Sequence, residues 1–274
     1  MINVIIFYRL YGMIGNCTIG DAPVFVIKYF VTPRGNQFMK SSGSEALKLL
    51  MTEKTNDLKT HQWVYQLLRN NLLSGRIEPG KPLTIRGLAE ILHVSPMPVR
   101  EALHRLACEG AVEVKNNRRV IVPSMTAEKF SELCELRILL ETHAAEGALP
   151  YINEKDIATL EQIDAKIDDA VERDQVDNIS LYNQEFHRYL YCANPFQISV
   201  PLIESLWLQL GPFSRIAISK LEKVYLVDRH VEAIDALKQR NLFGLRRAIE
   251  ADIRDGIASI NTVAGIHDYF RGVA

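Results

Sequence analysis

One short stretch of the chain has polar and basic side chains of the types and spacing that bind DNA. Ser95 and the free N–H groups of a helix start can bind phosphate, and Arg100, one turn further on, can donate two hydrogen bonds to guanine or phosphate. Arg86 precedes this helix, and three more cations follow it: Lys115, Arg118 and Arg119. The pattern predicts a helix that meets base edges while neighbouring cations bind the DNA backbone.

The alternative is that these arginines only form a solvated face. Residues 59–125 contain 10 basic and 5 acidic residues, a net charge of +5, whereas residues 126–274 have a net charge of −8. The whole chain has a net charge of only −1. A basic module followed by an acidic one favours nucleic-acid binding by the first.

A second group of polar side chains lies in the C-terminal half. Asn183 and His187 are four residues apart, so on one helix both point the same way. His230 and Asp252 each lie in a later segment of apolar helical periodicity. Two interpretations stay open: core polar groups with satisfied hydrogen bonds, or groups that bind a small ligand directly.

Arg137 is a further candidate for ligand binding. It lies on the apolar face of its predicted helix, and a buried arginine needs a partner. Glu141, one turn on, would give an intrahelical ion pair. An arginine in a pocket would instead bind the carboxylate of a small effector molecule through two hydrogen bonds, and we expect this second role.

The elements that position the first group are short helices. Helical periodicity begins at Thr60, and this first helix should stop at Gly75. Thr84 is typical of an N-cap and starts the second helix, while Ser95 followed by Pro96 starts the third. The third helix should end at Gly110.

Two β-branched runs follow, at residues 112–115 and 120–122. They flank Asn116 and Asn117, a pair that tolerates the positive φ of a tight hairpin. Three helices and a hairpin predict a winged helix-turn-helix.

The rest of the chain has only helical patterns. The predicted helices cover residues 126–149, 154–173, 176–193, 197–210, 213–220, 224–239 and 241–261. The predicted breaks are Pro150, Asp174, Asn194-Pro195, Gly211-Pro212 and Asn241. The fold is therefore expected to be mainly α: a winged helix-turn-helix followed by an all-α bundle of six or seven helices.

The length of 274 residues suits about two domains, and 47% apolar with 24% charged residues is typical of a globular protein. We expect a DNA-binding domain at 59–125, a helical domain at 126–264 and a tail at 265–274. Residues 1–58 form a poorly defined extension. It is either loosely ordered, with a start codon upstream of a true start at Met39 or Met51, or one or two strands packed on the rest.

No run of about 18 uncharged apolar residues occurs in the N-terminal segment. Charged residues interrupt it at Arg9, Asp21, Lys28 and Arg34. We therefore expect no membrane span. The four cysteines form no C-x-x-C pair and are typical of the reduced thiols of a cytoplasmic protein.

Residues 63–125 contain GRIEPGKPL, LAEILHVSPMPVREALHRL and an EG-x-V-x-V turn into the wing. These motifs closely resemble the DNA-binding domain of the GntR family of bacterial transcription regulators. The later helices resemble the effector-binding FCD domain of its FadR subgroup, through ELRILLETHAAEGAL, NQEFHRYLY, RHVEAIDAL and RRAIEADI. The resemblance covers residues 60–262. It implies a homodimer that binds an inverted repeat in double-stranded DNA and responds to a small metabolite, usually a carboxylate.

The sequence departs from the family pattern at two places that matter for operator choice. The family's common Ser-Arg-Thr-Pro is Ser95-Pro96-Met97-Pro98 here, so one arginine aimed at DNA is absent. The usual small, glycine-containing wing tip is replaced by residues 116–119. Arg86, Arg100 and the wing cations are the residues that the resemblance carries over.

The resemblance also implies a metal site. In that family an Asp four residues before a His joins two later His residues to hold a divalent metal. Asn183 replaces the Asp, His187 and His230 are kept, and Asp252 replaces the last His. Two imidazoles, one carboxylate and one amide oxygen suit Zn, Mn, Ni or Fe, and moving the single anionic ligand to Asp252 keeps the charge of the site.

The predicted function is a transcriptional regulator, a repressor, whose operator affinity changes with a bound carboxylate metabolite. One alternative is a metal-dependent enzyme that uses the Asn/His/His/Asp cluster. The basic module argues against an enzyme, and no positioned general base stands out. The other alternative is a DNA-binding protein that binds constitutively and takes no effector.

Overall fold

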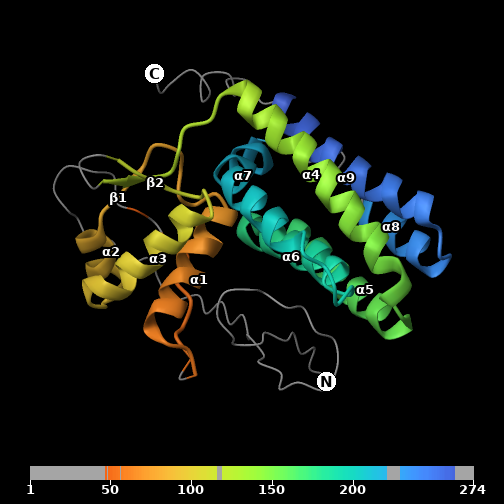
Figure 1. The fold of residues 1–274 in the computed structure, drawn as a ribbon, viewed down its shortest axis with the longest axis horizontal. Helices are drawn as coiled ribbons and strands as arrows, with labels where there is room; N and C mark the ends of the chain where they lie inside the picture. The colour runs from red at the N-terminus through yellow and green to blue at the C-terminus, as the bar shows by residue number, and fades with distance from the viewer. Residues whose placement is uncertain (1–46, 48, 56, 116–118, 221–228, 263–274) are drawn as a thin grey trace.

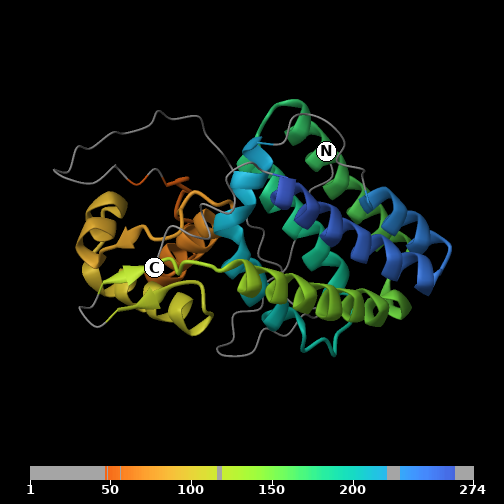
Figure 2. The same cartoon turned by 90° about the horizontal axis from the view of Figure 1, so that it is seen from above.

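The computed structural model describes residues 47, 49–55, 57–115, 119–220 and 229–262. Several predictions lie outside these residues: most of the extension, the start of the helix expected at 224, the tail, and the wing tip with Arg118. Figures 1 and 2 show two lobes, a small one with α1 to α3 and a larger helical one, with α7 between them. No helix among the described residues is both long enough and apolar enough to span a membrane.

The small lobe is a winged helix-turn-helix, as predicted. Its helices are α1 (Thr60–Leu73), α2 (Ile85–Leu92) and α3 (Pro96–Cys108). Its strands are β1 (Pro82–Leu83), β2 (Glu113–Val114) and β3 (Val120–Ile121), and they form an antiparallel sheet in the order β1-β3-β2.

Local sequence signals set the ends of these helices. The Thr84 hydroxyl accepts a hydrogen bond from the Gly87 backbone and caps α2. Gly75 and Gly110 follow α1 and α3 with φ of 66° and 74°, a conformation that glycine adopts without a steric cost. The sequence did not predict β1, a two-residue strand in which Leu83 is buried and pairs with Val120.

The larger lobe is the predicted all-α bundle, with six α-helices in its described part. They are α4 (Ala127–Ala148), α5 (Glu154–Glu172), α6 (Val176–Tyr191), α7 (Val200–Lys220), α8 (Arg229–Lys238) and α9 (Leu242–Thr262), with a 3-10 turn at Leu149–Tyr151. α4 packs against α9, α6 and α7, while α5 packs against α6 and α8. α8 also packs against α9, so these contacts join all six helices into one bundle.

The helix break predicted at Gly211-Pro212 is wrong, since α7 runs through both residues. Pro212 removes one backbone N–H and its hydrogen bond, but the helix continues. Gly211 has a different role: a Cβ there would lie 2.5 Å from the Leu72 carbonyl oxygen and 2.7 Å from the Leu73 Cα. The missing side chain lets the backbone of α1 approach α7, so the two lobes are closely packed.

Ion pairs reinforce this junction between the lobes. Arg76, just after α1, donates its Nε to Asp177 on α6 at 2.9 Å and pairs with the same carboxylate through Nη2. Glu204 on α7 accepts from Arg188 of α6 at 2.5 Å and lies 3.4 Å from Arg69 of α1. The small lobe is therefore joined to α6 and α7 by charge as well as by packing.

Candidate DNA-binding surface and ligand site

The predicted DNA-contacting residues of α2 and α3 are all exposed. Ser95 is the N-cap of α3 and makes no capping hydrogen bond with its side chain, so its hydroxyl is available to phosphate. Arg86 and Arg100 form no ion pair with any other residue that the structure describes. The opposite face of α3 is buried through Val99, Ala102, Leu103 and Leu106. Packing thus fixes the helix while Arg100 stays free to contact DNA.

The wing places two further cations on the surface. Lys115 and Arg119 are exposed, and the Lys115 backbone N–H donates to the Arg119 carbonyl at 2.8 Å, which extends the hairpin past β2 and β3. The Lys115 ammonium also lies 2.9 Å from Glu113. An exposed pair of this kind is weak, so it can exchange for a phosphate contact.

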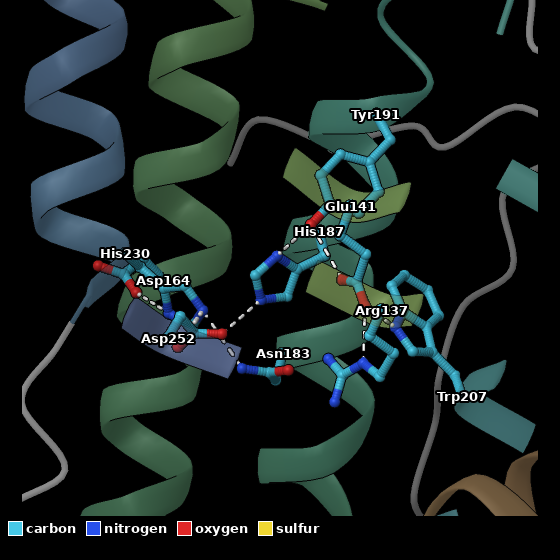
Figure 3. A network of polar contacts seen from close by, with 9 residues as sticks. All are labelled: Arg137, Glu141, Asp164, Asn183, His187, Tyr191, Trp207, His230 and Asp252. Carbon is cyan, nitrogen blue, oxygen red and sulfur yellow. Dashed lines mark hydrogen bonds and ion pairs between the residues drawn. The ribbon is translucent and has the colours of Figure 1, made fainter. Parts of the chain in front are cut away.

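The second predicted group converges inside the helical lobe (Figure 3). Asn183 and His187 come from α6, His230 from α8 and Asp252 from α9. Donor atoms of the two histidines and Asp252 all lie within 4.8 Å of one another. Three helices therefore bring together residues that are far apart in the sequence.

His187 is held at both ring nitrogens. The Tyr191 hydroxyl donates to Glu141 at 3.0 Å, because an ionised carboxylate can only accept. That hydroxyl oxygen accepts from the Nδ1–H of His187 at 3.0 Å. The Nε2 of a neutral His187 then carries a lone pair that faces the Asp252 carboxylate at 3.0 Å. Two acceptors at this distance need a cation between them, either a proton or a metal ion.

His230 has the same arrangement. Its Nδ1–H donates to Asp164 on α5 at 3.1 Å, so its Nε2 also presents a lone pair. The Asn183 amide donates to that Nε2 at 3.2 Å, and a flip of the amide would present its oxygen instead. Both histidines thus turn Nε2 toward Asp252, at 3.0 Å for His187 and 4.0 Å for His230.

Asp252 is ionised and can therefore bind a cation. Burial would raise its pKa, but the hydrogen bond from His187 and the positive charges of His187, His230 and Arg137 lower the pKa to about 2. Two neighbouring donors of an octahedral ion, each at about 2.1 Å, lie about 3 Å apart, and the separation of His187 Nε2 from Asp252 Oδ2 is 3.0 Å. That distance is also the length of a hydrogen bond, and His230 Nε2 lies farther from Asp252 Oδ1, at 4.0 Å. The types of donor atom present fit a divalent metal.

Arg137 forms the intrahelical pair that was the alternative interpretation. Its Nε donates to the buried Glu141 carboxylate at 2.6 Å. The Nη groups of Arg137 make no hydrogen bond or ion pair with another described residue, and its side chain stays 20% exposed. The guanidinium therefore has an open edge, and the pair with Glu141 and a ligand-binding role are compatible.

The sequence did not predict the roles of four residues of this network. They are Asp164, Tyr191, Trp207 and Glu141, the last as the shared acceptor of several hydrogen bonds. Trp207 donates its indole N–H to Glu141 at 2.9 Å, so this carboxylate has three donors. Asp164 carries a signal that could have revealed it. It occupies an apolar position of its helix beside Leu160, Ile163 and Ile167, and an acidic residue there needs a buried partner.

Comparison with known protein families matches both lobes. Residues 60–122 match the model of the bacterial regulatory proteins of the gntR family, and residues 132–255 match the FCD domain model. The chain belongs to the GntR family. This membership makes it a DNA-binding transcriptional regulator rather than an enzyme.

Individual relatives agree with this assignment. The regulator is 29% identical to the HTH-type transcriptional regulator McbR of Escherichia coli K12, over 70% of this chain and 88% of the relative. It is 27% identical to the gluconate operon transcriptional repressor of Bacillus subtilis 168, over 64% and 70% of the two chains. The solved structure of E. coli McbR/YncC superposes with a TM-score of 0.70 at 26% identity and covers 74% of this chain.

Proposed function

We propose that this GntR regulator is a cytoplasmic repressor that binds an inverted-repeat operator as a homodimer. A small carboxylate metabolite binds in its helical domain and changes the operator affinity. The repressor role is supported by a relative named as the repressor of a gluconate operon, and gluconate is itself a carboxylate. Two copies are expected because one α3 contacts one half-site, and an inverted repeat has two.

A divalent metal at the cluster would be held by Asn183, His187, His230 and Asp252. The observation that carries this proposal is the pair of histidine Nε2 atoms that face an ionised carboxylate, each on a ring held by a hydrogen bond at Nδ1. The donor set suits Zn, Mn, Ni or Fe. When bound, the metal supplies a positive centre that attracts an anionic ligand.

Arg137 supplies the second contact for a carboxylate. Its pair with Glu141 uses Nε and orients the guanidinium, while the Nη groups remain for two hydrogen bonds to the ligand. Arg137 and Asp252 belong to the same polar network (Figure 3), so both can act on a ligand bound there.

The ligand site is linked to the DNA-binding lobe through α6 and α7. α6 carries Asn183 and His187, and it also carries Asp177, which pairs with Arg76 next to α1. On α7, Trp207 contacts Glu141, and Gly211 lies against α1. A ligand that favours one position of these helices shifts the DNA-binding lobes by its differential affinity for the two arrangements.

Metal analysis of the purified protein followed by calorimetric titration with Zn²⁺ and Mn²⁺ tests the cluster. We expect one ion per chain, and an affinity at least about tenfold lower in Asp252→Ala, because losing even an outer partner costs that much. Asp235→Ala is the matched control, since Asp235 is an exposed carboxylate on the neighbouring helix α8. Equal metal affinity in all three proteins would refute the metal site.

A thermal-shift screen of small carboxylates on metal-loaded protein tests the effector. Arg137→Lys keeps the positive charge that pairs with Glu141 but loses the planar guanidinium. The variant should therefore still bind the metal but show no increase in melting temperature with the carboxylate. A constitutive DNA-binding protein is the competing function. It predicts that neither a metal nor any carboxylate changes the melting temperature or the operator affinity.

A further inference from the structure

The segment just before α1 is part of the DNA-binding lobe, although it precedes the matched family domain, which starts at residue 60. The Leu50 backbone N–H donates to the Asn71 side-chain oxygen at 2.6 Å, and the Asn71 amide donates back to the Leu50 carbonyl at 3.0 Å. The Trp63 indole donates to the Thr52 carbonyl at 3.0 Å. These bonds fix residues 49–55 along α1.

This path brings Lys54 to the turn of the helix-turn-helix motif. Lys54, Thr60 and Trp63 line one side of a cleft of about 470 Å³, and its other side includes His93, Ser95 and Pro98. The cleft therefore opens beside the start of α3. None of the described residues that line it is acidic.

Lys54 is held in place while most of its hydrogen-bonding capacity stays unused. Its ammonium donates to the Thr60 hydroxyl at 3.0 Å, which leaves two of its three N–H donors. The side chain is exposed and forms no ion pair within the described part of the chain. The Ser95 hydroxyl on the same cleft does not cap its helix.

The start of α3 has fewer backbone N–H groups to bind an anion than most helix starts. A helix normally presents free backbone N–H groups at its first turn, but Pro96 and Pro98 have none. A cation from another segment is one way to replace these missing donors. Lys54 is the lysine among the residues that line the cleft, and its side chain is exposed.

We propose that Lys54 binds a backbone phosphate of the DNA next to the recognition helix α3. The DNA-binding surface of this regulator then extends beyond the family domain to Lys54. A single flexible ammonium on the flank of the motif suits the backbone and not a base, because lysine acts as a point charge. The contact strengthens binding to any duplex and carries no sequence preference.

The salt dependence of DNA binding tests this contact. Fluorescence anisotropy gives the Kd for a duplex from upstream of the regulator's own gene and for a scrambled duplex, between 50 and 200 mM salt. Lys54→Gln should reduce the slope of log Kd against log salt by about 0.9 per bound chain. Its loss of affinity relative to wild type should therefore shrink across this range by about 3.5-fold for one bound chain, or about 12-fold for a bound dimer, equally on both duplexes.

Two matched variants separate charge from structure. Lys54→Arg keeps the charge and should keep the wild-type slope. Lys155→Gln removes an exposed lysine from the start of α5, in the helical lobe, and should change neither slope nor affinity. If Lys54→Gln has the slope of wild type, or loses affinity only on the upstream duplex, the phosphate contact is wrong. The test uses DNA binding alone, so a failure of the proposed metal or effector site does not affect it.

Discussion

Gly211→Ala tests how the two lobes are joined. An added Cβ would lie 2.5 Å from the Leu72 carbonyl oxygen, 2.7 Å from the Leu73 Cα and 3.1 Å from the Leu72 carbonyl carbon. All three are backbone atoms of α1, so no side-chain rotation relieves the clash. The two helices must therefore move apart, and the packing between the lobes is loosened.

Two effects of opposite sign set the magnitude. Alanine is a better helix former than glycine by about 0.5 to 1 kcal/mol, which favours the variant. Overpacking of a close contact costs about 1 to 3 kcal/mol, and a rigid backbone neighbour places this cost in the upper part of the range. We therefore expect Gly211→Ala to lower the free energy of unfolding by about 1 to 2 kcal/mol.

Gly256→Ala is the matched control for this substitution. Gly256 lies on α9, is exposed, and has no neighbour within 4 Å of an added Cβ. The same change there should raise the free energy of unfolding by about 0.5 to 1 kcal/mol. Urea unfolding followed by circular dichroism, at one protein concentration, compares the two variants. If Gly211→Ala is as stable as Gly256→Ala, α1 and α7 are not in the close contact described.

Three further predictions concern single side chains of the two sites. Arg100→Ala should weaken operator binding by about 1 to 3 kcal/mol and relax its specificity if Arg100 contacts a base. An operator Kd equal to that of wild type in anisotropy titrations would show that Arg100 does not contact the DNA. Tyr191→Phe removes the acceptor of a buried histidine N–H and a donor to Glu141, so it should lower the free energy of unfolding by about 2 to 4 kcal/mol. Tyr189→Phe is the control. The Tyr189 hydroxyl donates to the Asp156 carboxylate, and its loss should lower the free energy of unfolding by less. Because the pKa of Asp252 falls from 3.8 to about 2 on folding in the metal-free protein, its stabilisation is complete above about pH 5 and is lost as the pH falls through 2. Acid titration should show this loss of about 2 kcal/mol in wild type and its absence in Asp252→Asn.

The sequence predicted the winged helix-turn-helix well because its signals are local. The Thr84 cap and the glycines after α1 and α3 each act on the adjacent backbone, and the structure has them in these roles. The helix break predicted at Gly211-Pro212 was wrong for the same reason. Locally the pair indicates a break, but the glycine allows a close contact with α1, which is distant in the sequence.

The ligand site was only partly predictable. Asn183 and His187 share a face at a spacing visible in the sequence, and family resemblance supplied His230 and Asp252. The hydrogen bonds that orient the two imidazoles come from Asp164 and from Glu141 through Tyr191. Which helix faces which is a property of the packed bundle, so these partners appear only in the structure.

The central claim is that occupancy of the helical domain controls DNA affinity, and one linkage measurement tests it. The operator Kd is measured by anisotropy at fixed salt for metal-free protein, metal-loaded protein, and metal-loaded protein with the carboxylate that gives the largest thermal shift. We expect the Kd to change by at least about fivefold between two of these states, and not in a His187→Ala, His230→Ala double variant that still binds the operator. An operator Kd that is the same in all three states of the wild-type protein would contradict the claim.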